Sequence, residues 1–117
     1  MTGSVSYHSG RVAEDQVAQI YSRTGRPIAA RRWRGRSGEI DLIARDGAGV
    51  IFIEVKKSAT HAMAAERLSN RQMARIYGAA AEFLAGEPAG QATSARFDVA
   101  LVDSMGRIEV LEGAFAA

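Results

Sequence analysis

The chain has 117 residues, 47% of them hydrophobic, which is enough for one domain with one core. It contains no cysteine, so disulfides, thiolate chemistry and a cysteine-based zinc site are excluded. The formal net charge is only +2, but arginine supplies 13 of the 15 basic residues. No apolar run is long enough to span a membrane, and the N-terminus lacks the pattern of a secretory signal, so we expect a cytoplasmic protein without membrane contact.

The first third of the chain predicts a tail, a helix and a strand. Small and polar residues at positions 1–9 predict a disordered tail, which leaves a single domain over residues 10–117. Ser9 can cap a helix that runs to about Arg23, because apolar residues recur on one stripe of that segment. Residues 27–33 then predict a short strand.

Two apolar runs within residues 39–57 flank the turn sequence Asp46-Gly47-Ala48-Gly49 and predict a β-hairpin. Gly47 can adopt the positive backbone angle that a tight turn requires. A turn centred between Gly47 and Ala48 pairs Asp46 with Gly49. Counting outward from this turn pairs Leu42 with Ile53, Asp41 with Glu54, Ile40 with Val55 and Glu39 with Lys56.

Side chains alternate along the hairpin strands, which separates an apolar face from a face that carries charges. Like charges directly opposite each other destabilise a sheet, and charged groups are rarely buried without a partner. A divalent cation between Asp41 and Glu54 would remove that penalty, because Mg²⁺ favours carboxylate oxygens, water and phosphate. Glu39 lies on the same face, where a cross-strand ion pair with Lys56 competes with a role as a spare ligand. The apolar face is expected to carry Ile40, Leu42, Ala44, Ile51, Ile53 and Val55, and the other face Glu39, Asp41, Ile43, Phe52, Glu54 and Lys56.

The second half of the chain predicts one helix and two strands. Residues 58–68 lack clear periodicity and predict a loop. Ser69 can cap a second helix, whose apolar face extends to Leu84. Alternation predicts a strand at residues 95–102, and a final strand follows at residues 107–111. The order α-β-β-β-α-β-β predicts an α/β or α+β fold with a mixed β-sheet flanked by helices.

The charged face of the hairpin contains the groups that hydrolysis of a phosphodiester at a metal requires. Carboxylates hold the ion, a water on the ion becomes the nucleophile, and a positive group stabilises the extra charge on the phosphate. Asp41 and Glu54 can hold the metal, with the backbone carbonyl of Val55 as a further ligand. Lys56 can stabilise the phosphate or orient the water. The alternative is that both acids form plain ion pairs at the end of a sheet.

Five segments resemble the YraN-like family of small bacterial proteins, and the resemblance covers most of the chain. The two hairpin segments are the specific part of this match. The segments are Gly10-Arg11 with Glu14, Arg32-Trp33-Arg34, Gly38-Glu39-Ile40-Asp41-Leu42-Ile43-Ala44, Phe52-Ile53-Glu54-Val55-Lys56 and Arg96-Phe97-Asp98-Val99.

That family is assigned to the PD-(D/E)XK nuclease superfamily, near archaeal Holliday-junction resolvases and restriction endonucleases. The resemblance implies a restriction-endonuclease-like core and a Mg²⁺- or Mn²⁺-dependent endonuclease that cuts DNA, including branched or recombination intermediates. The superfamily's first acid falls on Asp41, and its acid-x-lysine element falls on Glu54 and Lys56. An acid from the first helix of resolvase-like members, a further metal ligand, falls on Glu14. Such relatives pair so that two sites reach two strands, which implies a homodimer.

The arginines predict contact with nucleic acid, because guanidinium groups suit phosphate oxygens. Four of them crowd the segment ahead of the hairpin, where Trp33 can pack in the core or stack on a base. The alternative for this cluster is a salt-bridged, solvated strand end. The family's basic run at the second helix is thinner here, which implies weaker nucleic-acid binding. The predicted nucleic-acid-binding residues are Arg31, Arg32, Arg34, Arg36, Arg71 and Arg75.

Two further functions stay open at this point. One is a nucleic-acid-binding module that has the same fold and does not cut, and the other is a structural or protein-interaction domain. The sequence also leaves two roles unassigned. Gln72 precedes Tyr77 at a spacing that does not match the helical motif of recombination-type nucleases, and Asp98 either buttresses the site or pairs with Arg96.

Overall fold

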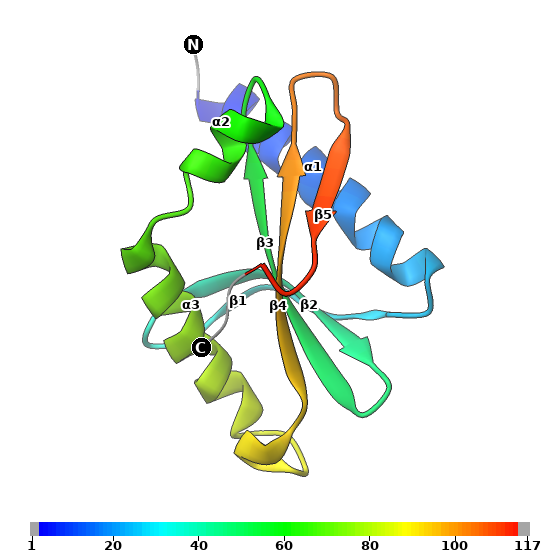
Figure 1. The fold of residues 1–117 in the computed structure, drawn as a ribbon, viewed down its shortest axis with the longest axis vertical. Helices are drawn as coiled ribbons and strands as arrows, with labels where there is room; N and C mark the ends of the chain where they lie inside the picture. The colour runs from blue at the N-terminus through cyan, green and yellow to red at the C-terminus, as the bar shows by residue number, and fades with distance from the viewer. Residues whose placement is uncertain (1–2, 115–117) are drawn as a thin grey trace.

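The computed structural model of the chain describes residues 3–114, and the side chains of residues 10–114. These residues form an α+β fold in which a mixed five-stranded sheet has the order β1-β2-β3-β4-β5 (Figure 1). Strands β3 and β4 are parallel, and the other neighbouring pairs are antiparallel. The elements are α1 (Gly3–Arg23), β1 (Ile28–Arg34), β2 (Glu39–Asp46), β3 (Gly49–Lys57), α2 (His61–Glu66), α3 (Asn70–Leu84), the 3-10 helix η1 (Gly90–Ala92), β4 (Ala95–Val102) and β5 (Ile108–Leu111).

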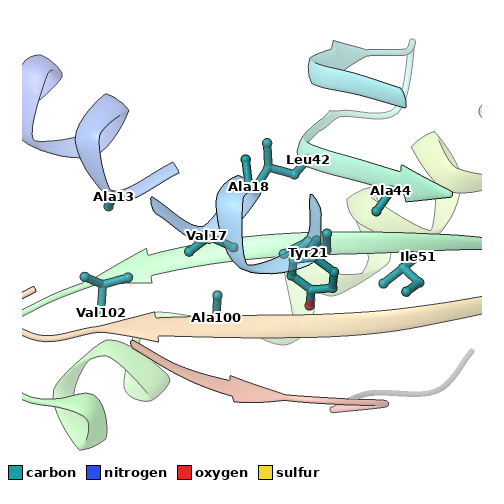
Figure 2. Close-up of a cluster of buried hydrophobic side chains, with 10 residues drawn as sticks. Ala13, Val17, Ala18, Tyr21, Leu42, Ala44, Ile51, Ala100 and Val102 are labelled. Carbon is teal, nitrogen blue, oxygen red and sulfur yellow. The ribbon is translucent and has the colours of Figure 1, made fainter. Parts of the chain in front are cut away.

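Helices α1 and α3 pack on opposite faces of the sheet, so the core has two parts (Figure 1). On one face, Val17 and Tyr21 of α1 lie against Ile51 of β3 and Ala100 of β4 (Figure 2). On the other face, buried residues of α3 pack with residues of β2 and β3; they include Ile76, Ala79, Ala80 and Leu84 from the helix, and Ile43, Val50 and Phe52 from the strands. The predicted arrangement of a mixed sheet flanked by helices is confirmed at this level.

The hairpin turn and the register next to it are as predicted. Asp46 pairs with Gly49, and Gly47 has a φ of 60°, as a two-residue turn with a positive first angle requires. The ladder continues outward to the pair Leu42–Ile53. It ends there within the described residues, so the predicted pairs Asp41–Glu54, Ile40–Val55 and Glu39–Lys56 are absent from it. The physical reason is that the Asp41 carboxylate, and not a backbone carbonyl of β2, accepts the hydrogen bond of the Val55 N–H.

For the apolar residues of the hairpin, the predicted division into two faces holds except at Ile40. Leu42, Ala44, Ile51 and Ile53 belong to the cluster beneath α1, while Ile43 and Phe52 belong to the cluster beneath α3. Ile40 was expected on the α1 side but packs in the α3 cluster. Past Leu42 the backbone ladder of β2 continues only on the β1 side within the described residues, where Ile40 pairs with Trp33. The Trp33 ring contacts Phe83 of α3 at 5.5 Å between centroids. Trp33 is therefore a packing residue.

Two of the α-helical segments differ from the prediction. Helix α1 begins at Gly3, earlier than the expected start at Ser9, so residues 3–9 of the predicted tail are helical; positions 1–2 lie outside the described residues. The predicted loop at residues 58–68 contains the short helix α2, because the Thr60 side chain accepts a hydrogen bond from the Met63 N–H at 3.1 Å and caps it. The predicted cap of α3 is confirmed, since the Ser69 hydroxyl accepts from the Gln72 N–H at 3.1 Å.

Within residues 3–114, none of the helices is both long enough and apolar enough to cross a membrane.

Candidate functional site

The two acids of the hairpin lie together at the point where the β2–β3 ladder ends. Glu54 on β3 is only 5% exposed, and Asp41 on β2 is half-buried. The Asp41 Oδ2 atom accepts a hydrogen bond from the Val55 N–H at 2.8 Å, which holds this carboxylate next to the residue that follows Glu54. Burial raises the pKa of Glu54 to about 9, with the hydrogen bond and charge of Asp41 acting in the same direction and Lys56 opposing them. The two carboxyl groups therefore share one pocket.

The two oxygens of Glu54 have different surroundings. Its Oε2 atom lies 3.2 Å from the Lys56 Nζ atom and also accepts a hydrogen bond from the Gln72 side-chain amide. Its Oε1 atom is buried, and no N–H or O–H donor of the described residues reaches it when both acids are ionised. A hydrogen bond between the Glu54 and Asp41 carboxyl groups requires a proton on one of them. A buried carboxylate oxygen without a partner is costly unless a proton or a cation satisfies it.

This donor set fits a hard divalent cation of the magnesium type. Mg²⁺ is usually held by one or two carboxylates, and waters and substrate phosphates complete its coordination. Glu54 offers a free buried oxygen and Asp41 a second carboxylate beside it. Among the described residues, no group of three or more His, Cys, Asp or Glu side chains is placed to hold a metal, so these two acids make an incomplete cage that solvent and substrate would have to complete. The carbonyl of Val55 stays a predicted ligand.

Glu14 reaches the edge of this pocket from α1 but is already engaged. Its Oε1 and Oε2 atoms accept hydrogen bonds from the Arg32 guanidinium at 3.1 and 3.3 Å. Burial raises the pKa of Glu14; the hydrogen bond from Arg32 lowers it, and the charge of Asp41 raises it further. Glu14 is thus close enough to Asp41 to sense its charge, and Arg32 would have to release it before it could bind a metal.

The predicted ion pair between Glu39 and Lys56 is wrong. Glu39 instead pairs with Arg34 at 3.0 Å, and Lys56 pairs with Glu54. Both residues have other partners than predicted because the hairpin ladder ends early. Glu39 stays beside β1, where it pairs with Arg34 in the sheet register. Lys56 is only 16% exposed, and its contact with Glu54 places its ammonium group in the acidic pocket.

The structure divides the predicted nucleic-acid-binding arginines into two groups. Three of them pair with acids: Arg31 with Asp15 at 2.7 Å, Arg32 with Glu14, and Arg34 with Glu39. The others are exposed and form no ion pair within residues 10–114; they are Arg36 between β1 and β2, and Arg71 and Arg75 on α3. The alternative of a salt-bridged strand end therefore describes β1, and the unpaired positive charge lies on the loop and on α3.

Gln72 is the site residue whose role the sequence did not reveal. Ser69 and Gln72 have the spacing of a capping box, in which the glutamine side chain would turn back to the Ser69 N–H. In the structure the Gln72 amide donates to Glu54 instead. The available signal was the capping motif itself, which placed Gln72 in the first turn of α3, but only the packing of α3 on the sheet brings that turn to Glu54.

Asp98 pairs with Arg96, which is one of the two roles that the sequence left open for it. It lies outside the acidic pocket. It is fully buried and accepts hydrogen bonds from the Tyr21 hydroxyl at 2.7 Å and from the Gly113 N–H at 3.0 Å. The Arg96 guanidinium adds two more hydrogen bonds, at 2.8 and 2.9 Å. Because Tyr21 comes from α1, this network joins α1, β4 and the C-terminal segment on the face opposite to Glu54.

These features define an α+β domain with a mixed sheet and a buried pair of carboxylates beside a lysine. The chain belongs to the UPF0102 family: the family model described as "Uncharacterised protein family UPF0102" matches residues 13–102. Similar relatives are a UPF0102 protein of Cereibacter sphaeroides strain KD131, 74% identical over the full length of both chains, and one of Ruegeria pomeroyi, 57% identical over 97% of this chain and 92% of the relative. A UPF0102 protein of Dinoroseobacter shibae is 43% identical over 93% of this chain and 81% of its own. The predicted YraN-like family is thereby confirmed.

Proposed function

We propose that the protein is a cytoplasmic, Mg²⁺- or Mn²⁺-dependent endonuclease that hydrolyses phosphodiester bonds in DNA, with a restriction-endonuclease-like core of the PD-(D/E)XK superfamily. The observation that carries the proposal is the buried Oε1 atom of Glu54, which no donor of the described residues reaches when both acids are ionised, beside Asp41 and Lys56. A core that needed only an ion pair between Glu54 and Lys56 would not leave a second carboxyl next to it and an oxygen unsatisfied.

Asp41 and Glu54 would hold the metal, which when bound polarises a phosphate oxygen and makes a water molecule more acidic. The Asp41 carboxylate is oriented by the Val55 N–H, and the Glu54 carboxylate by the Gln72 amide. Such hydrogen bonds fix a ligand in the geometry that binding requires before the ion arrives. In this proposal the Val55 carbonyl is a further ligand, and Glu14 becomes one once Arg32 moves to a phosphate.

Lys56 supplies the positive charge of the site. Its Nζ atom lies 3.2 Å from Glu54, at the same pocket, and its side chain is largely shielded from water. A fixed cation in a partly buried site stabilises the extra negative charge that develops on the phosphate during attack by water. Lys57 follows on the opposite side of the strand by alternation and serves as the matched control for this role.

A second function is favoured by a separate observation. The exposed arginines Arg36, Arg71 and Arg75 carry charges that no acid within residues 10–114 neutralises through an ion pair. A module that binds DNA through these arginines without cutting it would need them and would not need the carboxylates. Binding that persists in EDTA, together with an absence of cleavage, supports this alternative.

The deciding experiment is a cleavage assay on duplex, flap and four-way DNA with Mg²⁺ or Mn²⁺. We expect cleavage by the wild-type protein, at least a hundredfold slower cleavage by Glu54→Gln and Lys56→Ala, and normal cleavage by the controls Glu66→Gln and Lys57→Ala. Cleavage that is the same in all five proteins would come from a contaminant and would refute the proposal. Sedimentation of the protein with and without four-way DNA tests whether it acts as a homodimer.

A further inference from the structure

The loop that joins β1 to β2, residues 35–38, is packed directly on α3. A Cβ atom at Gly78 would lie 2.6 Å from both Cβ and Oγ of Ser37, which is closer than side-chain atoms approach one another. At Gly38 it would lie 3.0 Å from the Arg75 Cβ atom. Only a residue without a side chain at position 78 allows this approach, so the close contact between loop and helix requires Gly78.

The Glu82 carboxylate joins the loop to the helix. Its Oε1 atom accepts a hydrogen bond from the Arg36 N–H at 2.8 Å, and its Oε2 atom accepts one from the Ser37 N–H at 3.0 Å. These two backbone hydrogen bonds lower the pKa of Glu82 below its usual range, so it is ionised at neutral pH. The loop is also closed on itself, because the Gly35 N–H donates to the Gly38 carbonyl at 2.9 Å.

The joined loop extends a positive stripe along α3. Arg71, Arg75, Gly78 and Glu82 follow one another at spacings of four, three and four residues, which places them on one face of the helix. The Glu82 contact lies at one end of this face, and the first turn of α3, from which Gln72 reaches Glu54, lies at the other. Arg36 is therefore held beside the same helix face as Arg71 and Arg75, along the helix whose first turn reaches the acidic pocket through Gln72.

We propose that Glu82 is a positioning residue for DNA binding, which holds the loop of residues 35–38 on α3 so that Arg36, Arg71 and Arg75 together contact successive phosphates of one strand. This inference rests on the proposed function, and it names the surface by which that function would engage its substrate. The expected effect of Glu82 on DNA affinity is opposite to that of most acidic residues. A carboxylate near a phosphate-binding surface normally weakens binding, whereas here it strengthens binding through the arginine that it positions.

The test is fluorescence anisotropy with a labelled DNA duplex in EDTA, at several salt concentrations, so that the DNA is not cut. We expect Glu82→Ala to weaken binding about three- to tenfold and to lower the salt slope by about one phosphate contact, as Arg36→Gln does. The control Glu66→Ala removes an exposed acid of α2 and should leave binding unchanged or stronger. Glu82→Gln keeps an oxygen that can accept one of the two N–H groups, and should fall between wild type and Glu82→Ala.

A second variant keeps the test decisive if Glu82→Ala does not fold. Gly78→Ala changes no charge, but its methyl group displaces Ser37 and with it the loop. It should weaken binding to the same extent as Arg36→Gln, and combining the two substitutions should cause no further loss, because both act through Arg36. Gly86→Ala, where a Cβ atom meets only ordinary van der Waals contact, is the matched control.

Three outcomes decide between the proposals. Weaker binding by Glu82→Ala and Gly78→Ala, with normal controls, supports the positioning role. Unchanged or tighter binding by both variants, while the wild-type protein binds DNA, overturns it and leaves the proposed endonuclease intact. If the wild-type protein binds no DNA with or without Mn²⁺, the endonuclease proposal fails and this inference fails with it.

Discussion

The Asp41 carboxylate accepts a hydrogen bond from the Val55 N–H at 2.8 Å, at the position where the hairpin ladder has ended. One side chain thus completes the backbone hydrogen bonding of the neighbouring strand and also faces Glu54. These two roles can be separated by mutation, because an asparagine keeps an oxygen that accepts the Val55 N–H and loses the negative charge.

We expect the midpoint of urea unfolding of Asp41→Asn to lie at nearly the same urea concentration as that of the wild-type protein. Asp41→Ala leaves the Val55 N–H without its partner and should lose about 1–3 kcal/mol of stability. Both variants should lose the stabilisation by Mn²⁺ that the wild-type protein shows, because binding to the native state alone raises stability. Thermal unfolding with and without Mn²⁺ measures this second effect. Mn²⁺ stabilisation that survives in both variants would show that the metal binds elsewhere.

The buried Glu54 predicts a pH-dependent stability in the absence of metal. Its pKa is raised from 4.5 to about 9 in the folded protein, so between these values the native state holds a proton that the unfolded chain has released. The free energy of unfolding should therefore fall as the pH rises across this range, by at most about 1.4 kcal/mol per pH unit from this residue. Glu54→Gln, which is neutral at every pH, should flatten the profile in urea titrations at pH 5, 7 and 9.

Addition of Mn²⁺ should act in the opposite direction, because the metal competes with the proton for the same carboxylate. Its stabilising effect on the wild-type protein should grow from pH 5 to pH 8. A wild-type profile that already matches that of Glu54→Gln would mean that Glu54 is ionised in the metal-free protein.

The hydrogen bond from Gln72 to Glu54 predicts an effect on metal affinity. Removing a residue that orients a ligand typically weakens metal binding about 10- to 100-fold. We expect Gln72→Ala to need correspondingly more Mn²⁺ for half-maximal cleavage, with a smaller change in the rate at saturating metal. Gln19→Ala, an exposed substitution on α1, is the control. An equal loss of rate at every Mn²⁺ concentration would instead assign Gln72 to the substrate.

The Asp98 network predicts a loss of stability that is independent of metal. Asp98 is fully buried and satisfies Tyr21, Arg96 and the Gly113 N–H at once. Asp98→Ala should cost about 3–5 kcal/mol, because it leaves the buried Tyr21 hydroxyl and the partly buried Arg96 guanidinium and Gly113 N–H without their acceptor, whereas Tyr21→Phe should cost about 1 kcal/mol. Urea unfolding in EDTA measures both. Comparable losses in the two variants would show that Tyr21 supplies most of the network's contribution.

The sequence predicts the hairpin well because the rules that determine it are local. The two-residue turn sets the register, and strict alternation assigns Leu42, Ile43, Phe52 and Ile53 to their faces. The same rules fail beyond Leu42, where a side chain replaces a backbone carbonyl as the partner of Val55. Nothing in the alternation of apolar and polar residues signals that exchange, so the displacement of Ile40 could not be predicted.

The partners of the charged residues were less predictable because they depend on how helices are placed across the sheet. Arg31 and Arg32 meet Asp15 and Glu14 only because α1 lies over β1, and the phase of that helix is set by its core residues. The approach of Gln72 to Glu54 likewise depends on where α3 begins. The residue types of the candidate site could be predicted from the motif, whereas their pairings required the three-dimensional arrangement.

The hairpin turn and the acidic pocket occupy opposite ends of the β2–β3 ladder. The pairs from Asp46–Gly49 to Leu42–Ile53 separate them, and the exposed turn residues Gly47 and Ala48 contribute no side chain to the pocket. Lengthening an exposed loop costs little stability, and the cost grows slowly with each added residue. The tip of this hairpin is therefore a suitable attachment point for a fluorophore or an affinity tag, at which the protein can be labelled or immobilised while its carboxylates stay undisturbed.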